Sequence, residues 1–120
     1  MPTAIIVEDD QSLANTFWHY FISLGWGAQV VIDGAKAYDQ LQEAIYDHRF
    51  SSTVILDLHL PGRSGEDIYQ MLKLNGFAGN VIICTADEKL AKEYALKGAT
   101  TLLKPVSVHE IGKLLKQDKE

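Results

Sequence analysis

Acidic, hydroxyl and amino side chains follow four apolar segments of this chain, each at the point where the segment ends. They are Glu8 and Asp9 after residues 4–7, Asp57 after residues 53–56, Thr85 after residues 80–84, and Lys104 after residues 100–103. Carboxylates that converge repel one another and bind protons more tightly unless a cation lies between them. Mg²⁺ suits carboxylates together with a phosphate, and an amine and a hydroxyl suit phosphoryl oxygens. The set therefore predicts a site that gathers a phosphoryl group, where positioning and charge neutralisation provide most of the catalysis.

Asp57 is the residue on which this prediction depends most. The preceding residues 53–56, Thr-Val-Ile-Leu, lack polar alternation, which is typical of a strand covered on both faces in a parallel sheet. Asp57 then lies at the rim of the sheet, where open α/β folds bind their ligands. Taken alone, Asp57 could equally open the turn at Pro61, and Lys104 could be a solvated surface charge. The functional interpretation rests on the four strand ends taken together.

The elements that must position these residues alternate strictly along the chain. Apolar runs predict strands over residues 4–7, 28–32, 53–57, 80–84 and 100–103. Helical spacing of apolar residues predicts helices over residues 13–24, 35–48, 68–72, 90–95 and 108–115. Five strands and five helices joined by short connections call for a parallel sheet with helices on both faces and right-handed crossovers.

The first and last helices carry more detailed predictions. Their inward residues are expected to be Leu13, Phe17, Phe21 and Leu24 in the first helix, and Val108, Ile111, Leu114 and Leu115 in the last. Asp10 is expected to cap the first helix rather than bind a metal, because aspartate favours that position. Ser107 and Glu110 have the spacing of a capping box at the start of the last helix.

Composition limits the class of protein. At 120 residues, with 47% hydrophobic and 22% charged residues, the chain is expected to form one domain, 1–120, of ordinary globular composition. A net charge of −5 argues against direct nucleic-acid binding, and no apolar run approaches the ~18–20 residues that membrane insertion requires. Residues 1–7 contain no basic-then-apolar leader, and a single cysteine, Cys84, excludes an internal disulfide, so we expect a cytoplasmic protein. Cys84 lies in an apolar run, where a small buried hydrophobe is expected rather than a reactive thiol.

Four segments carry a resemblance to a known family. They are Ile6-Val7-Glu8-Asp9-Asp10, Leu56-Asp57-Leu58-His59-Leu60-Pro61 with Gly65, Cys84-Thr85-Ala86, and Lys104-Pro105. In this order, and from near the first residue to the last helix, they resemble the receiver domain of bacterial two-component response regulators. The resemblance implies a flavodoxin-like α/β fold, a doubly wound five-stranded parallel sheet in the order 2-1-3-4-5. It also implies phosphorelay signalling, with a histidine kinase or a histidine phosphotransfer protein as the partner.

The resemblance assigns a role to each acidic residue. Asp57 is the implied phospho-acceptor, and a carboxylate that forms an acyl phosphate is known chemistry. Glu8 and Asp9 would hold Mg²⁺ (or Mn²⁺) together with Asp57, and the backbone carbonyl of His59 would complete the protein's ligands. Asp9 is favoured as a direct ligand, whereas Glu8 could act through water. The side chain of His59 would face the phosphoryl entrance, and its tuning of hydrolysis is a hypothesis.

The remaining implied roles concern the phosphoryl oxygens. Lys104 would pair with them, and Thr85 would turn to hydrogen-bond one of them. A cis Lys104–Pro105 bond, as in the family, would direct the lysine into the site. The implied protein catalyses only its own phosphorylation and slow hydrolysis, so it is a signalling protein and not a turnover enzyme.

Three features depart from the family pattern. Thr101 stands three residues before Lys104, where most receivers carry an aromatic residue whose rotation couples the site to a partner surface. Residues 98–101 lack the acidic residues that usually support dimers in regulators with winged-helix DNA-binding domains. Such a dimer is therefore not supported, and the oligomeric state stays open. The interval from Thr85 to Lys104 is short, which predicts a reduced or shifted fourth helix.

The first helix raises a separate question. Trp18 and Ile22 widen its apolar face beyond a single core stripe. Two interpretations remain open: deeper packing against Trp26 or the last helix, and a docking surface for a partner.

Other function classes remain as alternatives. Thr101 suggests a phosphorylation-independent protein-interaction module of the same fold. A metal-dependent phosphatase is disfavoured, because Asp57 lies on the third strand and His59 stands where such enzymes have a second acid. A nucleotide-binding domain is weaker still, because Gly25-Trp26-Gly27 lacks the third glycine of that motif. The cognate kinase, the signal and the effector are not readable, nor is whether the receiver stands alone or belongs to a longer protein.

Overall fold

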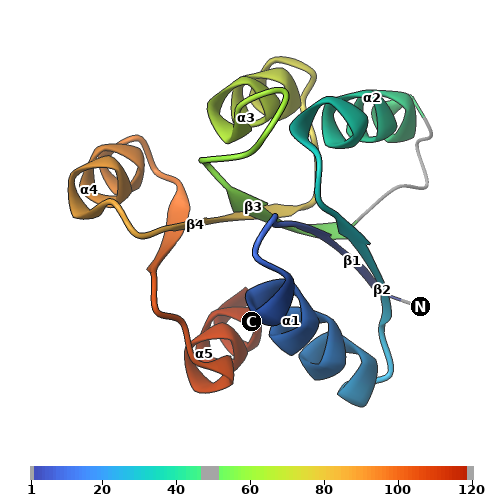
Figure 1. Cartoon of the computed structure of the whole chain (residues 1–120), viewed down its shortest axis with the longest axis vertical. Coiled ribbons are helices and arrows are strands. Elements are labelled where there is room, and N and C mark those ends of the chain that lie inside the picture. Colours follow the sequence, from blue (N-terminus) through green and yellow to red (C-terminus); the bar gives the residue numbers. More distant parts are fainter. Residues whose placement is uncertain (1, 47–51, 119–120) are drawn as a thin grey trace.

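The computed structural model describes residues 2–46 and 52–118, and these form a doubly wound α/β fold (Figure 1). The elements run β1 (Thr3–Val7), α1 (Gln11–Ser23), β2 (Gly27–Val31), α2 (Gly34–Ile45), β3 (Ser52–Asp57), α3 (Gly65–Leu74), β4 (Asn80–Thr85), α4 (Glu88–Leu96), β5 (Thr100–Leu103) and α5 (Val108–Asp118). All the strand pairs are parallel, and the strand order is β2-β1-β3-β4-β5. The predicted fold class and strand order are confirmed. The part of the second predicted helix beyond residue 46 lies outside the described residues.

The helices form two layers, one on each face of the sheet. In Figure 1, α1 and α5 lie on one side, and α2 and α3 lie on the other. Alternate side chains of β3 pack on opposite faces of the sheet, since Val54 and Leu56 belong to one apolar cluster and Ile55 belongs to the other. All six residues of β3 are buried. The strand that ends in Asp57 is therefore the central and most protected element of the fold.

Side-chain caps fix where the helices begin. The Asp10 carboxylate accepts a hydrogen bond from the Leu13 amide at 3.2 Å, which confirms its predicted role as the cap of α1. The capping box before α5 is also confirmed. The Glu110 amide donates to the Ser107 hydroxyl at 3.3 Å, and the Ser107 amide donates to the Glu110 carboxylate at 3.3 Å.

Two predicted core positions are wrong. Leu24 is 47% exposed because it is the residue after the last turn of α1, where the chain already turns away from the sheet. Val108, the first residue of α5, is 43% exposed. Phe17, Phe21 and Ile111 are buried as predicted.

The wide apolar face of α1 is explained in part by packing. The Trp18 indole N–H donates to the carbonyl of Ala28 at 3.3 Å, and Trp18 packs with Trp26 against the cluster beneath α1 and α5. Phe21 also contacts Trp26, with ring centroids 5.1 Å apart. These contacts support the packing interpretation for Trp18, whereas Ile22 is 41% exposed.

The fourth helix is short, as the interval from Thr85 to Lys104 predicts. Among the helices that the structure describes, α4 is the shortest with 9 residues and α1 is the longest with 13. No described helix is both long enough and apolar enough to span a membrane. Thr101 is paired with Ile83 of β4, so it lies on the same side of the sheet as Tyr94 of α4. Tyr94 packs edge-to-face on Tyr69 of α3, with ring centroids 5.1 Å apart.

Candidate functional site

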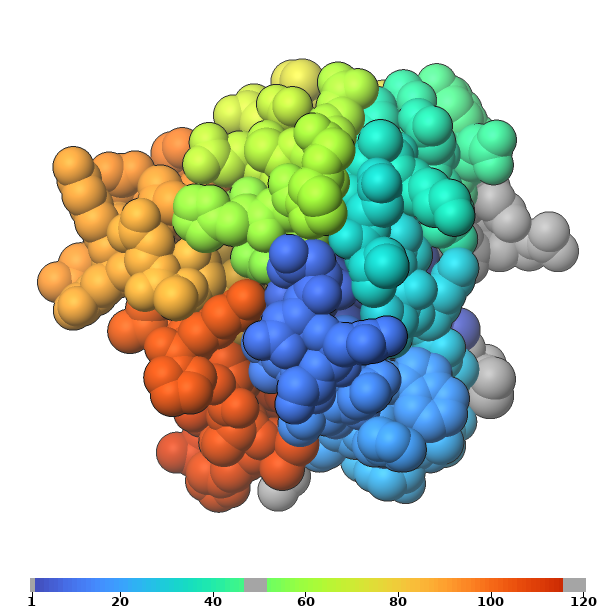
Figure 2. Space-filling model, viewed as in Figure 1, coloured from blue at the N-terminus to red at the C-terminus, as the bar shows by residue number. Residues whose placement is uncertain are grey.

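Parallel pairing brings the predicted functional residues to one edge of the sheet. In the register, Val7 of β1 lies beside Leu56 of β3, and Asp57 lies beside Cys84 of β4. The segments that leave these strands therefore leave side by side at their carboxyl ends. Figure 2 shows the start of α1, the segment before α3 and the segment before α5 meeting on one face of the molecule.

The three predicted acidic residues converge at this edge. Glu8, Asp9 and Asp57 each offer a carboxylate oxygen, and these oxygens lie within 4.8 Å of one another. Glu8 is 1% exposed and Asp57 is 3% exposed, whereas Asp9 is exposed. The Glu8 carboxylate accepts a hydrogen bond from the Asp10 amide at 3.2 Å, which fixes the turn between β1 and α1.

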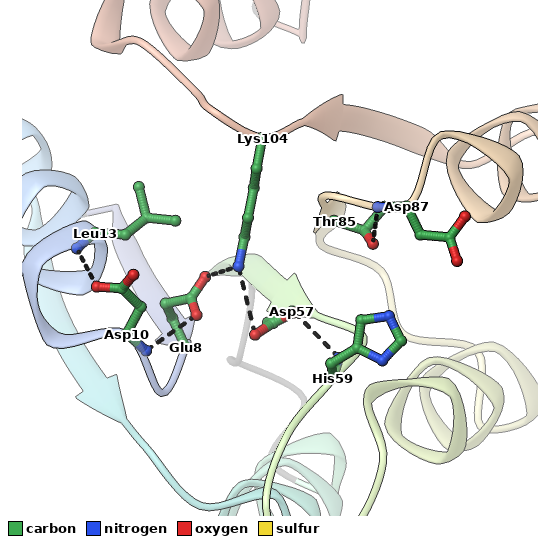
Figure 3. A network of polar contacts seen from close by, with 8 residues as sticks. All are labelled: Glu8, Asp10, Leu13, Asp57, His59, Thr85, Asp87 and Lys104. Carbon is green, nitrogen blue, oxygen red and sulfur yellow. Dashed lines mark hydrogen bonds and ion pairs between the residues drawn. The ribbon is translucent and has the colours of Figure 1, made fainter.

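Lys104 reaches into this acidic group from the end of β5 (Figure 3). Its Nζ lies 2.8 Å from Glu8 Oε1 and 3.5 Å from Asp57 Oδ2. Its amide donates to the carbonyl of Thr85 at 2.8 Å, and the Lys104–Pro105 bond is cis, as expected. The structure thus brings four of the predicted site residues, Glu8, Asp9, Asp57 and Lys104, into one cluster.

Burial and charge act against each other in this cluster. The pKa of Glu8 is raised to about 7, first because Glu8 is buried and also because Asp57 lies beside it. Hydrogen bonds from Lys104 and from the Asp10 amide act in the opposite direction. Burial lowers the pKa of Lys104, but Glu8 and then Asp57 more than offset that, so its pKa is raised. Lys104 is therefore a fixed positive charge that stabilises the carboxylates only in part.

The donor set of the cluster fits a hard divalent cation. Glu8, Asp9 and Asp57 carry three negative charges when ionised and Lys104 carries one positive charge, so two negative charges remain unbalanced. All the donor atoms are oxygens, which are the ligands that Mg²⁺ and Mn²⁺ prefer. The residues therefore fit the expected ion both in charge and in ligand type.

Thr85 and His59 are near the cluster but are held differently. Thr85 is buried, and its hydroxyl accepts a hydrogen bond from the Asp87 amide at 3.1 Å (Figure 3). The His59 amide donates to Asp57 Oδ1 at 3.1 Å, while its side chain is exposed. Both residues thus lie at the predicted edge, and His59 contacts Asp57 through its backbone.

Comparison with known proteins identifies the family. The family model described as the response regulator receiver domain matches residues 4–116. The chain belongs to this family. Receiver domains are the signalling modules of two-component systems, so the predicted recognition is confirmed.

Relatives of this receiver domain include a longer regulator. The sensory transduction protein RegX3 of Mycobacterium tuberculosis is 33% identical over 113 residues, which cover 92% of this chain and 48% of RegX3. The chain thus spans about half the length of this relative. The solved receiver domain of a LuxO repressor from Vibrio parahaemolyticus is 28% identical, with a TM-score of 0.78, over 97% of this chain and 88% of that chain. The solved receiver domain of a sensor histidine kinase from Pseudomonas aeruginosa is 23% identical, with a TM-score of 0.76, over 96% of this chain and 94% of that chain, and it shares the fold.

The thiol beside the site of this receiver domain is buried. Cys84 is fully buried on β4 next to Asp57, and burial raises its pKa to about 12. A thiol that stays protonated is a poor nucleophile. The prediction that Cys84 is a small buried hydrophobe is therefore confirmed.

Two features of the receiver site were not predicted from the sequence. Asp87 links the site to α4. Its amide donates to the Thr85 hydroxyl, and its carboxylate accepts from the Leu90 amide at 3.1 Å and so caps α4. An aspartate directly before a helix was a usable signal for this cap. The contact of Arg63 with Tyr38, described below, has no comparable signal in the sequence.

Proposed function

We propose that this receiver domain accepts a phosphoryl group on Asp57 from a phosphohistidine of a histidine kinase or a histidine phosphotransfer protein. The observation that carries the proposal is the position of the Asp57 carboxylate. It is buried at the end of the central strand, with Lys104 Nζ 3.5 Å from one oxygen and the His59 amide 3.1 Å from the other. A buried carboxylate between a cation and an amide is oriented for attack on a phosphorus atom.

The proposed transfer is a displacement at phosphorus. The Asp57 carboxylate attacks the phosphorus, the bond between phosphorus and the imidazole nitrogen of the donor breaks, and that nitrogen keeps the electron pair. The product is an acyl phosphate on Asp57. Lys104 neutralises the charge on the transferred group, and the Thr85 hydroxyl turns from the Asp87 amide to bind a phosphoryl oxygen. The domain carries out its own phosphorylation and slow dephosphorylation and does not turn over a free substrate.

Glu8, Asp9, Asp57 and the backbone carbonyl of His59 would hold Mg²⁺ or Mn²⁺ in the site. When bound, the ion supplies charge neutralisation for the transferred phosphoryl group. The support from this chain is its donor set, with three carboxylate oxygens within 4.8 Å of one another. The solved Pseudomonas aeruginosa receiver domain has a magnesium ion coordinated in its active site cleft.

A groove beside Lys104 gives the phosphoryl donor a place to bind. It has a volume of about 440 Å³ and lies between the start of α1 and the segment after β5. Its apolar walls come from Leu13, Ala86, Pro105 and Val106. An apolar groove next to a charged site suits the apolar face of a helix that carries a phosphohistidine. We therefore place the donor protein on this side of the domain.

Intact-mass analysis after incubation with acetyl phosphate tests the proposal. The wild-type chain is expected to gain one phosphate in Mg²⁺, which hydroxylamine removes because the adduct is an acyl phosphate. In EDTA the gain is expected to be lost, because the acidic cluster then has no divalent cation to balance it. A chain that gains no phosphate in Mg²⁺, from a donor that phosphorylates another receiver in parallel, would contradict the proposal. The phosphorylation-independent interaction module would then be the better explanation.

Lys104→Met is expected to lower the rate of phosphorylation by about 100-fold, because a positioned cation no longer stabilises the transferred group. The rate is measured by mass spectrometry at saturating acetyl phosphate and Mg²⁺. Lys97→Met is the matched control, since Lys97 is an exposed lysine whose Nζ lies 4.8 Å from the ring centroid of Tyr94. The control is expected to keep the wild-type rate. Equal rates in Lys104→Met and the wild type would remove Lys104 from the proposed machinery.

A further inference from the structure

The segment that follows Asp57 is packed against the start of α2. The Gly34 amide, at the first position of α2, donates to the carbonyl of Pro61 at 2.9 Å. A Cβ atom on Gly34 would lie only 1.7 Å from the carbonyl oxygen of Arg63. The two backbones therefore touch at a distance that only glycine permits.

A side-chain contact adds to this junction between the start of α2 and residues 58–64. The guanidinium carbon of Arg63 lies 3.6 Å from the ring centroid of Tyr38, one turn into α2. Asp67 of α3 lies 3.7 Å from Arg63 Nε, on the other side of the junction. Stacking of a guanidinium on an aromatic ring at this distance is attractive even at a partly exposed site. Figure 2 shows the yellow-green surface before and along α3 directly against the cyan surface of α2.

This junction supports the exposed middle of a segment whose two ends are held by hydrogen bonds. At the Asp57 end, the His59 amide is held by Asp57 Oδ1 at 3.1 Å. At the α3 end, the Gly65 amide donates to the carbonyl of Leu58 at 3.1 Å. Between these ends, Pro61 and Arg63 are exposed to solvent. Leu58 is buried in the core and Leu60 packs against it, so the contacts with Gly34 and Tyr38 act on the exposed part of the segment that follows them.

We propose that Tyr38 and Arg63 are positioning residues for the metal site, a role that rests on the proposed function. By fixing residues 58–64 against α2, they set where the backbone carbonyl of His59 stands relative to Glu8 and Asp57. Neither residue touches the acidic cluster. Groups that orient metal ligands from behind commonly contribute about tenfold or more to metal affinity.

Calorimetric titration with Mg²⁺ tests this role, beside hydrogen exchange of the Gly34 amide. Tyr38→Leu removes the ring without changing charge and is expected to raise the Kd for Mg²⁺ about tenfold. Exchange of the Gly34 amide is expected to become faster, because its bond to Pro61 opens more often. Tyr38→Phe keeps the ring and is expected to restore both values. Arg63→Lys keeps the charge but loses the planar stack, and it is expected to weaken Mg²⁺ binding in the same direction.

Control measurements separate this role from a general loss of stability. Urea unfolding in EDTA is expected to change by less than the Mg²⁺ affinity for Tyr38→Leu, since Tyr38 is partly buried against the core and leucine keeps an apolar side chain there. Lys97→Met disrupts a comparable contact on α4 and is expected to leave Mg²⁺ affinity unchanged. The inference is wrong, with the proposed function intact, if the wild type binds Mg²⁺ and takes up phosphate while Tyr38→Leu and Arg63→Lys bind Mg²⁺ equally well. A wild type that takes up no phosphate overturns the proposed function, and one that binds no Mg²⁺ overturns both.

Discussion

Asp57→Asn is expected to take up no phosphate from acetyl phosphate in Mg²⁺, where the wild type takes up one. The amide oxygen that replaces the carboxylate is not a nucleophile, and an acyl phosphate cannot form on it. The substitution preserves the shape of the side chain, and the oxygen at the Oδ1 position still accepts from the His59 amide. We therefore expect a folded protein without acceptor activity, measured by intact mass and by urea unfolding of the same samples.

A second carboxylate-to-amide change controls for the loss of charge alone. Asp39→Asn lies on the exposed side of α2 and is expected to take up phosphate like the wild type. Phosphate that still appears on Asp57→Asn would show that another carboxylate is the acceptor. Asp9, the exposed member of the acidic cluster, would be the first to examine.

The position of the acidic cluster was predictable because it depends on local pattern. An unbroken apolar run is a strand covered on both faces, and strands that alternate with helices must pair in parallel. Their carboxyl ends then share one edge, and the residues that follow, such as Asp57 and Lys104, converge there. The structure adds the pairing of Lys104 with Glu8, at 2.8 Å, which the order of elements did not determine.

The ends of helices were less predictable than their middles. Apolar spacing indicates the direction in which a side chain points, but not whether the sheet is still beneath it. Phe17 and Phe21 lie within α1 and are buried, whereas Leu24, which continues their spacing, follows the end of the helix and is 47% exposed. Val108 lies at the other end of a helix, at the first position of α5, and is also exposed.

The junction between α2 and the segment after Asp57 could not be predicted. Gly34 follows Asp33 and so has the sequence of an ordinary turn, and Arg63 and Tyr38 belong to different elements. Their contact depends on how the first turns of α2 and the segment between β3 and α3 pack against each other at the edge of the sheet. No periodicity within either segment encodes that geometry.

Gly65→Ala is expected to destabilise the protein by about 3 kcal/mol and to disturb the site. A Cβ atom on Gly65 would lie 2.0 Å from the carbonyl oxygen of Asp57 and 2.7 Å from the Cα atom of Leu58. These neighbours are backbone atoms, so they cannot turn away as a side chain could. Gly65 does not have a positive φ, so the constraint is space rather than conformation. Relief of the clash must move either α3 or the end of β3, which carries Asp57, and urea unfolding in EDTA measures the cost.

Gly112→Ala provides the matched control, because it makes the same substitution inside another helix. Its Cβ atom would lie 3.0 Å from the hydroxyl oxygen of Tyr20, the far end of a partly exposed side chain that can shift. Alanine also favours a helix interior over glycine by about 1 kcal/mol. We expect Gly112→Ala to stay within about 1 kcal/mol of the wild type and to keep its phosphorylation rate. Equal stability of Gly65→Ala and Gly112→Ala would mean that the first turn of α3 does not press on the end of β3, and that the backbone after Asp57 is free to move without cost.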